Sequence, residues 1–223
     1  MSDERSRNSR RGFLGRIGLL TLGAAWPAHK PRMAIDREGR VAPTWDMSWV
    51  ERVASAPYKA VIDSTDLSDG AALDLAADIM HQFHEVYNGP DEQTRVVVVM
   101  RRLGAVMAFE DALWNRYAIG EDRHIVDPAT KSPARRNPFL RAPASESRDD
   151  KIEPLVKRGM TILVCNRAAM NSARSLAEKS KRKVEDVQNE VRNGLVPGAY
   201  LMPDGIFALV RAQNAGCALM NPS

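Results

Sequence analysis

Short apolar runs alternate with amphipathic stretches along most of this chain. Five runs have the length and the β-branched content of strands, and they span residues 58–63, 95–100, 161–164, 199–202 and 217–220. The second run, RVVVVM, is apolar without interruption. An unbroken β-branched run is typical of a strand that is covered on both faces, as in a parallel sheet. We therefore expect a mostly parallel, five-stranded sheet.

The stretches between these runs carry apolar residues at intervals of three and four, which predicts helices. The clearest helix covers residues 71–87, and Asn88-Gly89-Pro90 ends it. Further helices are expected at residues 109–118, 152–158, 168–178, 184–193 and 206–215. Strands that alternate with helices require right-handed crossovers. The predicted fold class is therefore α/β, a three-layer α/β/α domain over residues 58–221.

Two segments show neither the apolar runs of strands nor the three- and four-residue spacing of helices. Residues 29–57 hold scattered proline, tryptophan and charge, and we expect an irregular N-terminal arm. Residues 121–150 hold four prolines among charged and small residues, which predicts a long inserted loop. Its six basic and six acidic residues cancel, so it does not have the charge of a nucleic-acid-binding arm. A loop of this length in a compact domain commonly carries function.

The N-terminus has the layout of an export signal. Paired arginines, Arg10 and Arg11, precede Phe13-Leu14 and a moderately apolar run. With Ser9, these residues resemble the twin-arginine signal, whose pattern is Ser/Thr-Arg-Arg-x-Phe-Leu. We therefore expect residues 1–28 to direct the folded protein through the twin-arginine machinery to a periplasmic or other extracytoplasmic location.

The same segment leaves the fate of the signal open. The apolar run is too short for a membrane span, which needs about 20 apolar residues. Gly23-Ala24-Ala25 is an acceptable cleavage site, whereas Trp26-Pro27-Ala28 is not. Cleavage and retention as an N-terminal anchor are therefore both compatible with the sequence.

The positive charge of the chain is local to this segment. The protein has 32 basic and 28 acidic residues, and five of the former and two of the latter lie in residues 1–28. The remainder has 27 basic and 26 acidic residues. The body of the protein therefore lacks the excess positive charge that a nucleic-acid partner would require. Two cysteines make no disulfide framework.

Cys165 is the residue that most suggests chemistry. It follows the apolar run 160–164, and a helical pattern begins directly after it. In open parallel sheets, ligands bind beyond the carboxyl ends of the strands. A helix N-terminus favours a thiolate there, and Arg167 adds a neighbouring positive charge. Nucleophilic or sulfur-carrying chemistry needs such a thiolate; the alternative is that Cys165 is a small hydrophobic residue at a strand end.

Other polar residues are predicted at the edges of the sheet. Asp63 and Ser64 end the first strand, with Asp66 and Ser68 just beyond, and they line the same edge as Cys165, as binding groups or as helix caps. Cys217 begins the last strand and so lies at the opposite edge. We expect no Cys165–Cys217 disulfide, because Cα atoms more than about 7 Å apart cannot be bridged.

We expect no metal and no cofactor. His81, His84 and Glu85 have metal-like spacing, but they avoid the apolar side of their helix and are expected on a solvated face. The sequence has no glycine-rich phosphate loop, no CxxC and no Ser-His-Asp pattern.

The order of features over residues 58–221 resembles the DsrE/DsrF-like family, which has the YchN-like fold. That family has a strand ending in cysteine, a Pro-Gly turn into a strand, and a helix with Gln-x-x-Gly before the last strand. The matching stretches are Val164-Cys165-Asn166, Leu195-Val196-Pro197-Gly198-Ala199 and Ala212-Gln213-Asn214-Ala215-Gly216. The chain departs from exported members in having Arg101-Arg102 where they have an Arg-His pair after the second strand.

This resemblance implies a homo-oligomer that carries sulfur as a persulfide on Cys165 and exchanges it with partner proteins. It places Gln213 and Arg101 as candidate binding residues at the sheet edge or a subunit contact. Gln213 lies on the apolar stripe of its helix, which equally fits a buried amide bonded to loop backbone. The known relay works in the cytoplasm, whereas this chain carries an export signal. The second hypothesis is therefore a non-catalytic oligomeric module that binds at the sheet edge or through residues 121–150, and the sequence leaves open whether the protein is an enzyme.

Overall fold

A computed structural model of the chain describes residues 45–142 and 149–222. A parallel five-stranded sheet with the order β4-β3-β2-β1-β5 forms its centre. The strands are β1 (Tyr58–Ser64), β2 (Thr94–Met100), β3 (Thr161–Cys165), β4 (Ala199–Met202) and β5 (Ala218–Met220). The predicted α/β class is confirmed, with every strand parallel to its neighbours.

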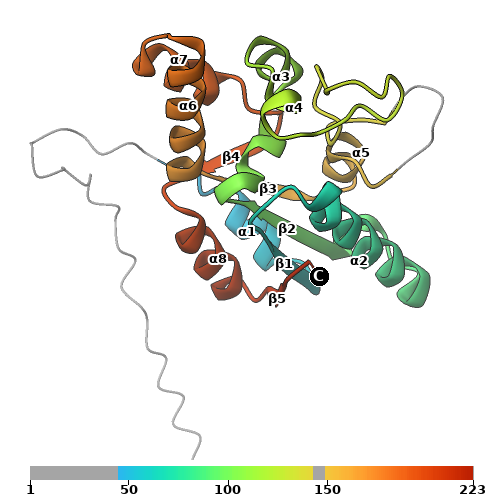
Figure 1. Cartoon of the computed structure of the whole chain (residues 1–223). Coiled ribbons are helices and arrows are strands. Elements are labelled where there is room, and N and C mark those ends of the chain that lie inside the picture. Colours follow the sequence, from blue (N-terminus) through green and yellow to red (C-terminus); the bar gives the residue numbers. More distant parts are fainter. Residues whose placement is uncertain (1–44, 143–148, 223) are drawn as a thin grey trace, which may run out of the picture. The chain divides into compact units, whose positions relative to one another are not determined.

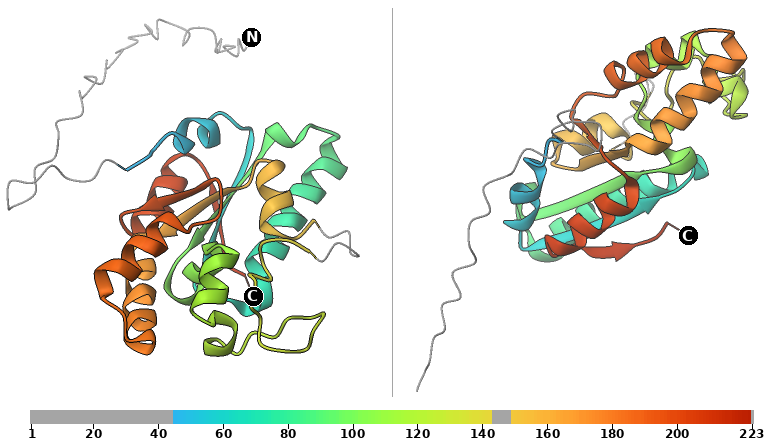
Figure 2. Two further views of the ribbon diagram at one scale, coloured as in Figure 1. Left: turned by 90° about the horizontal axis from the view of Figure 1, so that it is seen from above. Right: turned by 90° about the vertical axis from the view of Figure 1, so that its left-hand side faces the viewer.

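Helices cover both faces of this sheet (Figure 1). Seen from above, the strands lie between α8 (Gly205–Asn214) on one side and α2 (Ala71–Tyr87) on the other (Figure 2, left). The helix α1 (Trp49–Ala54) packs on the α8 side, and α5 (Ile152–Lys157) packs on the α2 side. The predicted three layers are therefore present.

The uniform apolarity of β2 follows from this arrangement. Val97 and Val99 belong to the core under α8, whereas Val96 and Val98 belong to the core under α2, and all four are fully buried. Each contributes about 1.5–3 kcal/mol relative to an exposed side chain. A strand that is covered on both faces exposes no side chains to water, so polar and apolar residues do not alternate along it. This is why the run predicted a central parallel strand.

The remaining helices complete the α2 side and its flank. After β2 come the 3-10 segment η3 (Arg102–Ala108), α3 (Asp111–Arg116) and α4 (Ile119–Asp122), and after β3 come α6 (Asn166–Ser180) and α7 (Val184–Asn193). Two short 3-10 segments are η1 (Ser68–Gly70) and η2 (Asp91–Gln93). The helix predicted at residues 109–118 is thus shorter, and η3 precedes it because residues 104–108 bury small and apolar side chains in a tight turn.

We predicted an irregular arm at residues 29–57, and this prediction is wrong for residues 45–57, the part that the structure describes. Residues 49–54 form α1, and its Trp49 and Val53 are fully buried against the sheet. A helix of six residues is too short to show a periodic pattern, and its stability comes from this tertiary contact.

The segment 121–150 is irregular as expected from residue 123 onward, within its described part, but it is not a free loop. Ala134, Phe139 and Leu140 are buried in the main core. The amide of Asn137 is also buried, and its Nδ2 donates to the carbonyl oxygens of Met107 and Phe109 at 2.7 and 2.8 Å. This segment is therefore an integral wall of the domain.

The inward side of α8 also differs from the prediction. The sequence pattern placed Ile206, Leu209, Val210 and Gln213 together on one side, but of these α8 buries Leu209 alone, together with Gly205, Ala208 and Ala212. Small residues let the helix lie close to the sheet, and they carry little hydrophobic signal. The large apolar side chains Ile206, Phe207 and Val210 are consequently 55%, 40% and 50% exposed.

The residues of the proposed export signal, Arg10, Arg11, Phe13 and Leu14, lie outside the described residues. Within residues 45–142 and 149–222, no helix has the length and apolarity that crossing a bilayer requires.

Candidate functional site at the carboxyl edge of the sheet

The carboxyl ends of β1, β2 and β3 bring the predicted site residues into one row. In the sheet register Ser64 pairs with Met100, and Met100 pairs with Val164. Asp63, Arg101 and Cys165 are each at most one position from these paired residues. The parallel topology thus assembles residues that are 38 and 64 positions apart along the chain, as the sequence pattern predicted.

Asp63 and Arg101 bind each other. The guanidinium of Arg101 donates from Nε and Nη2 to the two carboxylate oxygens of Asp63, and both distances are 2.6 Å. Their side chains are 14% and 21% exposed. The hydrogen bonds that Arg101 donates to Asp63 raise the pKa of Arg101 above its usual value, with smaller contributions from the charges of Cys165 and Asp204. This pair is therefore charge-compensated in the structure.

Arg101 is fixed in place from two further sides. Its main-chain N–H donates to the carbonyl oxygen of Ser64 at 2.9 Å, which extends the link between β1 and β2 past the strand ends. Its side chain runs along Gly205, where an added Cβ would lie 2.7 Å from Cδ of Arg101. The first residue of α8 is therefore a glycine at a point of close approach.

Cys165 lies at the start of α6. Its Sγ accepts a hydrogen bond from the N–H of Ala168 at 3.4 Å, so the thiol caps a helix of 15 residues. Cys165 is only 5% exposed, so little of its thiol is accessible to a reagent.

The sequence suggested that Arg167 lies beside Cys165, but the structure directs its side chain elsewhere. Its side chain is 78% exposed, and Nη1 pairs with the carboxylate of Asp204 at 3.1 Å. Asp204 also caps α8 by accepting from the N–H of Ile206 at 2.7 Å. On a helix, Cys165 and Arg167 are two positions apart and so point in different directions. Arg101, one strand over, is the cation whose charge acts on the thiol.

The structure places Gln213 away from this edge and does not bury its amide, whereas its predicted role at a subunit contact stays a prediction. It is exposed, near the C-terminal end of α8. The helix runs from the carboxyl edge back to the amino edge, where Gly216 packs against Lys59 at the start of β1. The pattern misplaced Gln213 because its helix buries the side that carries small residues.

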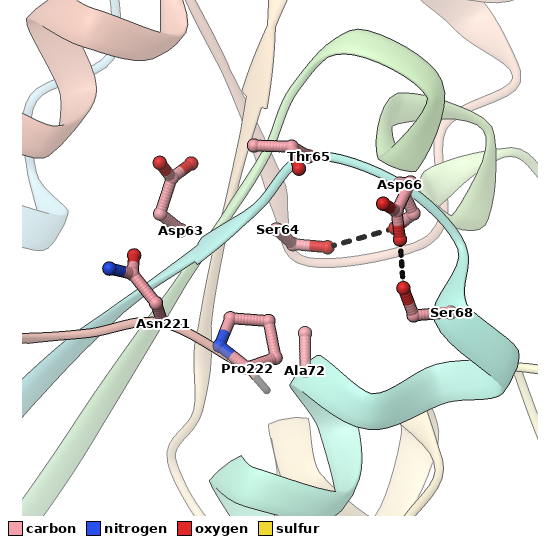
Figure 3. Close-up of a pocket in the computed structure, with 8 residues that line it drawn as sticks. All are labelled: Asp63, Ser64, Thr65, Asp66, Ser68, Ala72, Asn221 and Pro222. Carbon is pink, nitrogen blue, oxygen red and sulfur yellow. Dashed lines mark hydrogen bonds between the residues drawn. The ribbon is translucent and has the colours of Figure 1, made fainter.

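A small polar cavity of about 160 Å³ lies beside the row, between the ends of β1 and β5 and the start of α2. Figure 3 shows the hydroxyl groups of Ser64 and Ser68 directed at Asp66, while Asp63 and Asn221 flank the other side. Ser64 is 1% exposed and donates to the main-chain oxygen of Asp66 at 3.4 Å. The volume is below the roughly 300 Å³ of the smallest typical ligand sites, so this cavity suits a small polar group.

Sequence reasoning missed Asn221 in this cavity. Its position directly after the last strand could have indicated it, because the carboxyl ends of parallel strands lie at the same edge of the sheet. Sequence reasoning also missed Gly104, where an added Cβ would lie 2.8 Å from the carbonyl oxygen of Ser64. No local sequence pattern indicates that the main chain at Gly104 lies so close to Ser64.

The two cysteines differ in their surroundings. Both are free thiols. Cys217 is 7% exposed and precedes β5 at the amino edge, and burial raises the pKa of its thiol to about 11, with Lys59 opposing the shift. Among the described residues, no three His, Cys, Asp or Glu side chains form a group that could hold a metal.

Comparison with known proteins adds little to this geometry. No protein-family model matches the chain, and no curated protein sequence matches it significantly. One matching solved structure is that of a protein of unknown function, MTH1491, from Methanobacterium thermoautotrophicum. The match has 14% sequence identity and a TM-score of 0.40, and it covers 74% of this chain and 99% of the other.

Proposed function

We propose that the protein is a thiol-based sulfur carrier in which Cys165 is the acceptor. The observation that supports this most directly is the contrast between the two thiols. Cys165 caps α6 at the edge where parallel sheets hold ligands, beside Arg101, whereas burial holds Cys217 in the unreactive protonated form.

In the proposed step, the thiolate of Cys165 attacks the outer sulfur of a donor persulfide, R–S–SH. The S–S bond of the donor breaks as the new S–S bond forms, the donor leaves as R–S⁻, and the transferred sulfur keeps its proton. Attack by an acceptor thiolate on the Cys165 persulfide reverses the step, so no external oxidant or reductant is needed. Because Cys165 is nearly buried, the donor and the acceptor are protein partners or small persulfides that fit closely against this edge.

The experiment is incubation of the folded protein with glutathione persulfide, followed by intact-mass and peptide analysis. Wild type and Cys217→Ser should gain the mass of one sulfur atom, and Cys165→Ser should gain none. Sulfur carried by Cys217, or by neither cysteine while the protein is folded, rules out the proposal.

A second candidate function is a non-catalytic oligomeric module. The specific observation is the outer face of α8, where Ile206, Phe207 and Val210 are exposed. Arg211 is the one charged residue within α8, so two copies of this face can approach with little charge repulsion. We propose a second copy of this chain as its occupant.

We also propose that the protein is exported through the twin-arginine route. The support is the Arg10-Arg11 pair with Phe13 and Leu14. Lysine at both arginine positions should leave the protein in the cytoplasm when it is expressed in a bacterial host. Continued export of that variant would contradict the proposal, whatever the role of Cys165.

A further inference from the structure

A second cavity lies at the amino edge of the sheet, where β2, β3 and β4 begin. Its volume is about 300 Å³, at the lower end of the range for small-molecule sites. The lining residues that matter here come from α1, three strand starts and two turns, and they are Arg52, Arg95, Tyr200, Thr161, Gly159 and Gly198. The cavity is at the opposite end of the strands from Cys165.

Two arginines face this cavity with neutral partners. Nη1 of Arg95 donates to the main-chain oxygen of Asp91 at 3.4 Å, and Nη2 of Arg52 donates to the phenol oxygen of Tyr200. The guanidinium of Arg52 also lies 5.6 Å from the centre of the Tyr200 ring. Within the described part of the chain, neither arginine has a carboxylate at ion-pair distance.

The nearby carboxylates are engaged elsewhere. Arg158 holds the carboxylate of Asp91 with two hydrogen bonds of 3.2 Å and also pairs with Asp149 at 3.7 Å. The main-chain N–H of Ser48 is the main cause that lowers the pKa of Asp46, and Arg52 contributes least. The local charge around the cavity is therefore positive.

Lys59 is a third basic residue at this edge of the sheet, although it does not line the cavity. It pairs in register with Arg95 on the neighbouring strand, so both side chains leave the same face of the sheet. Its Nζ donates to the main-chain oxygen of Ala54 at 2.7 Å, again a neutral acceptor.

Two glycines with positive φ line the cavity. Gly159 has a φ of 106°, and a Cβ there would collide with Nη1 of Arg95. Gly198 has a φ of 82°, and a Cβ there would contact Val156 at 3.4 Å. Gly159 is therefore a side-chain-free position where the guanidinium of Arg95 reaches the cavity.

We infer that this cavity binds a small molecule through an oxyanion, a phosphate or carboxylate group held by Arg52 and Arg95. The planar guanidinium fork matches both groups with paired hydrogen bonds. The hydroxyl of Tyr200 supplies a third polar contact, and Thr161, which is 6% exposed, forms the floor at the start of β3. The inference is independent of sulfur transfer at Cys165.

The test is titration of the full chain, labelled with nitrogen-15, with inorganic phosphate, phenyl phosphate and benzoate at constant ionic strength. The expected result is saturable shifts of the amide signals of Gly159, Thr161 and Gly198 with at least one of the three probes. Saturation by inorganic phosphate identifies the free ion, and saturation by an organic probe alone identifies an organic anion. Arg52→Gln and Arg95→Gln should each weaken binding by about tenfold or more, the loss of one charge-assisted hydrogen bond.

Two matched variants keep the result interpretable. Lys157→Ala removes an exposed charge next to Val156 without changing the cavity wall, and its affinity should equal that of the wild type. Tyr200→Phe keeps the ring packing and should weaken binding even if an arginine variant folds poorly. The inference is overturned if none of the three probes saturates, if the shifts spread evenly over basic surface residues, or if Lys157→Ala loses as much affinity as the arginine variants.

Discussion

Asp63 and Arg101 form a two-point ion pair across the ends of β1 and β2, with both nitrogen–oxygen distances at 2.6 Å. Sequence reasoning treated them as separate binding groups. Their pairing means that the charge of Arg101 is largely compensated before any ligand arrives. We therefore expect Asp63 to weaken the effect of Arg101 on the thiol of Cys165.

The first prediction concerns this effect. Asp63→Asn should speed the alkylation of Cys165 by iodoacetamide, because Arg101 then acts uncompensated on the thiolate. Arg101→Gln should slow it, each by roughly two- to tenfold, as expected for one unit charge acting through partly buried protein. Rates are measured by peptide mapping at fixed pH, with Asp66→Asn as the control carboxylate. Equal rates in all four proteins would show that the pair does not influence the thiol.

Asp63→Asn should also reduce the free energy of unfolding by about 1–3 kcal/mol, because it leaves a partly buried guanidinium without its charged partner. Urea unfolding measures this loss. An unchanged unfolding midpoint would mean that water replaces the carboxylate at no cost.

The reactivity of Cys217 should depend steeply on pH. Burial raises the pKa of this thiol to about 11, so at pH 8 only about one molecule in a thousand carries the thiolate. Residual labelling of Cys165→Ser should therefore rise about tenfold per pH unit between pH 8 and 10. Labelling of Cys217 that is fast at pH 8 in the folded protein would contradict the burial.

Glu190 should make stability fall on acidification. Hydrogen bonds from Arg182 and Tyr117 lower the pKa of Glu190 to about 2, from 4.5. Because the pKa is lower in the folded state, the stabilisation is complete well above pH 4.5 and is lost as the pH falls toward 2. The wild type should therefore exceed Glu190→Gln in thermal midpoint at pH 7, and this difference should shrink below pH 4.5. A pH-independent difference would mean that packing, not charge, carries the contribution.

Asn137→Ala should be among the more destabilising polar substitutions outside the sheet. It removes three buried hydrogen bonds, two donated to the carbonyl oxygens of Met107 and Phe109 and one accepted from the N–H of Phe139, at a cost of about 1–3 kcal/mol for each partner left unsatisfied. Urea unfolding measures the loss, and Ser132→Ala, at an exposed position of the same segment, should change stability by less than about 0.5 kcal/mol. Similar values for both variants would show that the segment is not part of the core.

The exposed face of α8 should determine the oligomeric state. Ile206→Asp places a charge in the proposed contact, and light scattering should then report a smaller assembly than for the wild type. Val86→Asp, at another exposed apolar position, is the matched control and should leave the mass unchanged. A wild type that is monomeric at high concentration would remove the second candidate function.

The sequence by itself determined the alternation of strands and helices, because large apolar side chains report burial directly. The run RVVVVM specified a strand buried on both faces, and Asn88 was recognisable as the end of α2, where it adopts a φ of 46°. Parallel topology then sufficed to place Asp63, Arg101 and Cys165 at one edge, since the ends of parallel strands coincide.

The tertiary structure alone decided which charges pair and which faces are covered. Arg101 rather than Arg167 acts on Cys165, because the partner of a long side chain depends on the register of a neighbouring strand. Gln213 and Ile206 lie outside because α8 turns its small residues inward, and small residues carry almost no hydrophobic signal along the sequence. The arginine-lined cavity at the amino edge was also decided by the tertiary structure alone. Its walls come from α1, β2 and β4, which are distant along the chain and meet only through their packing.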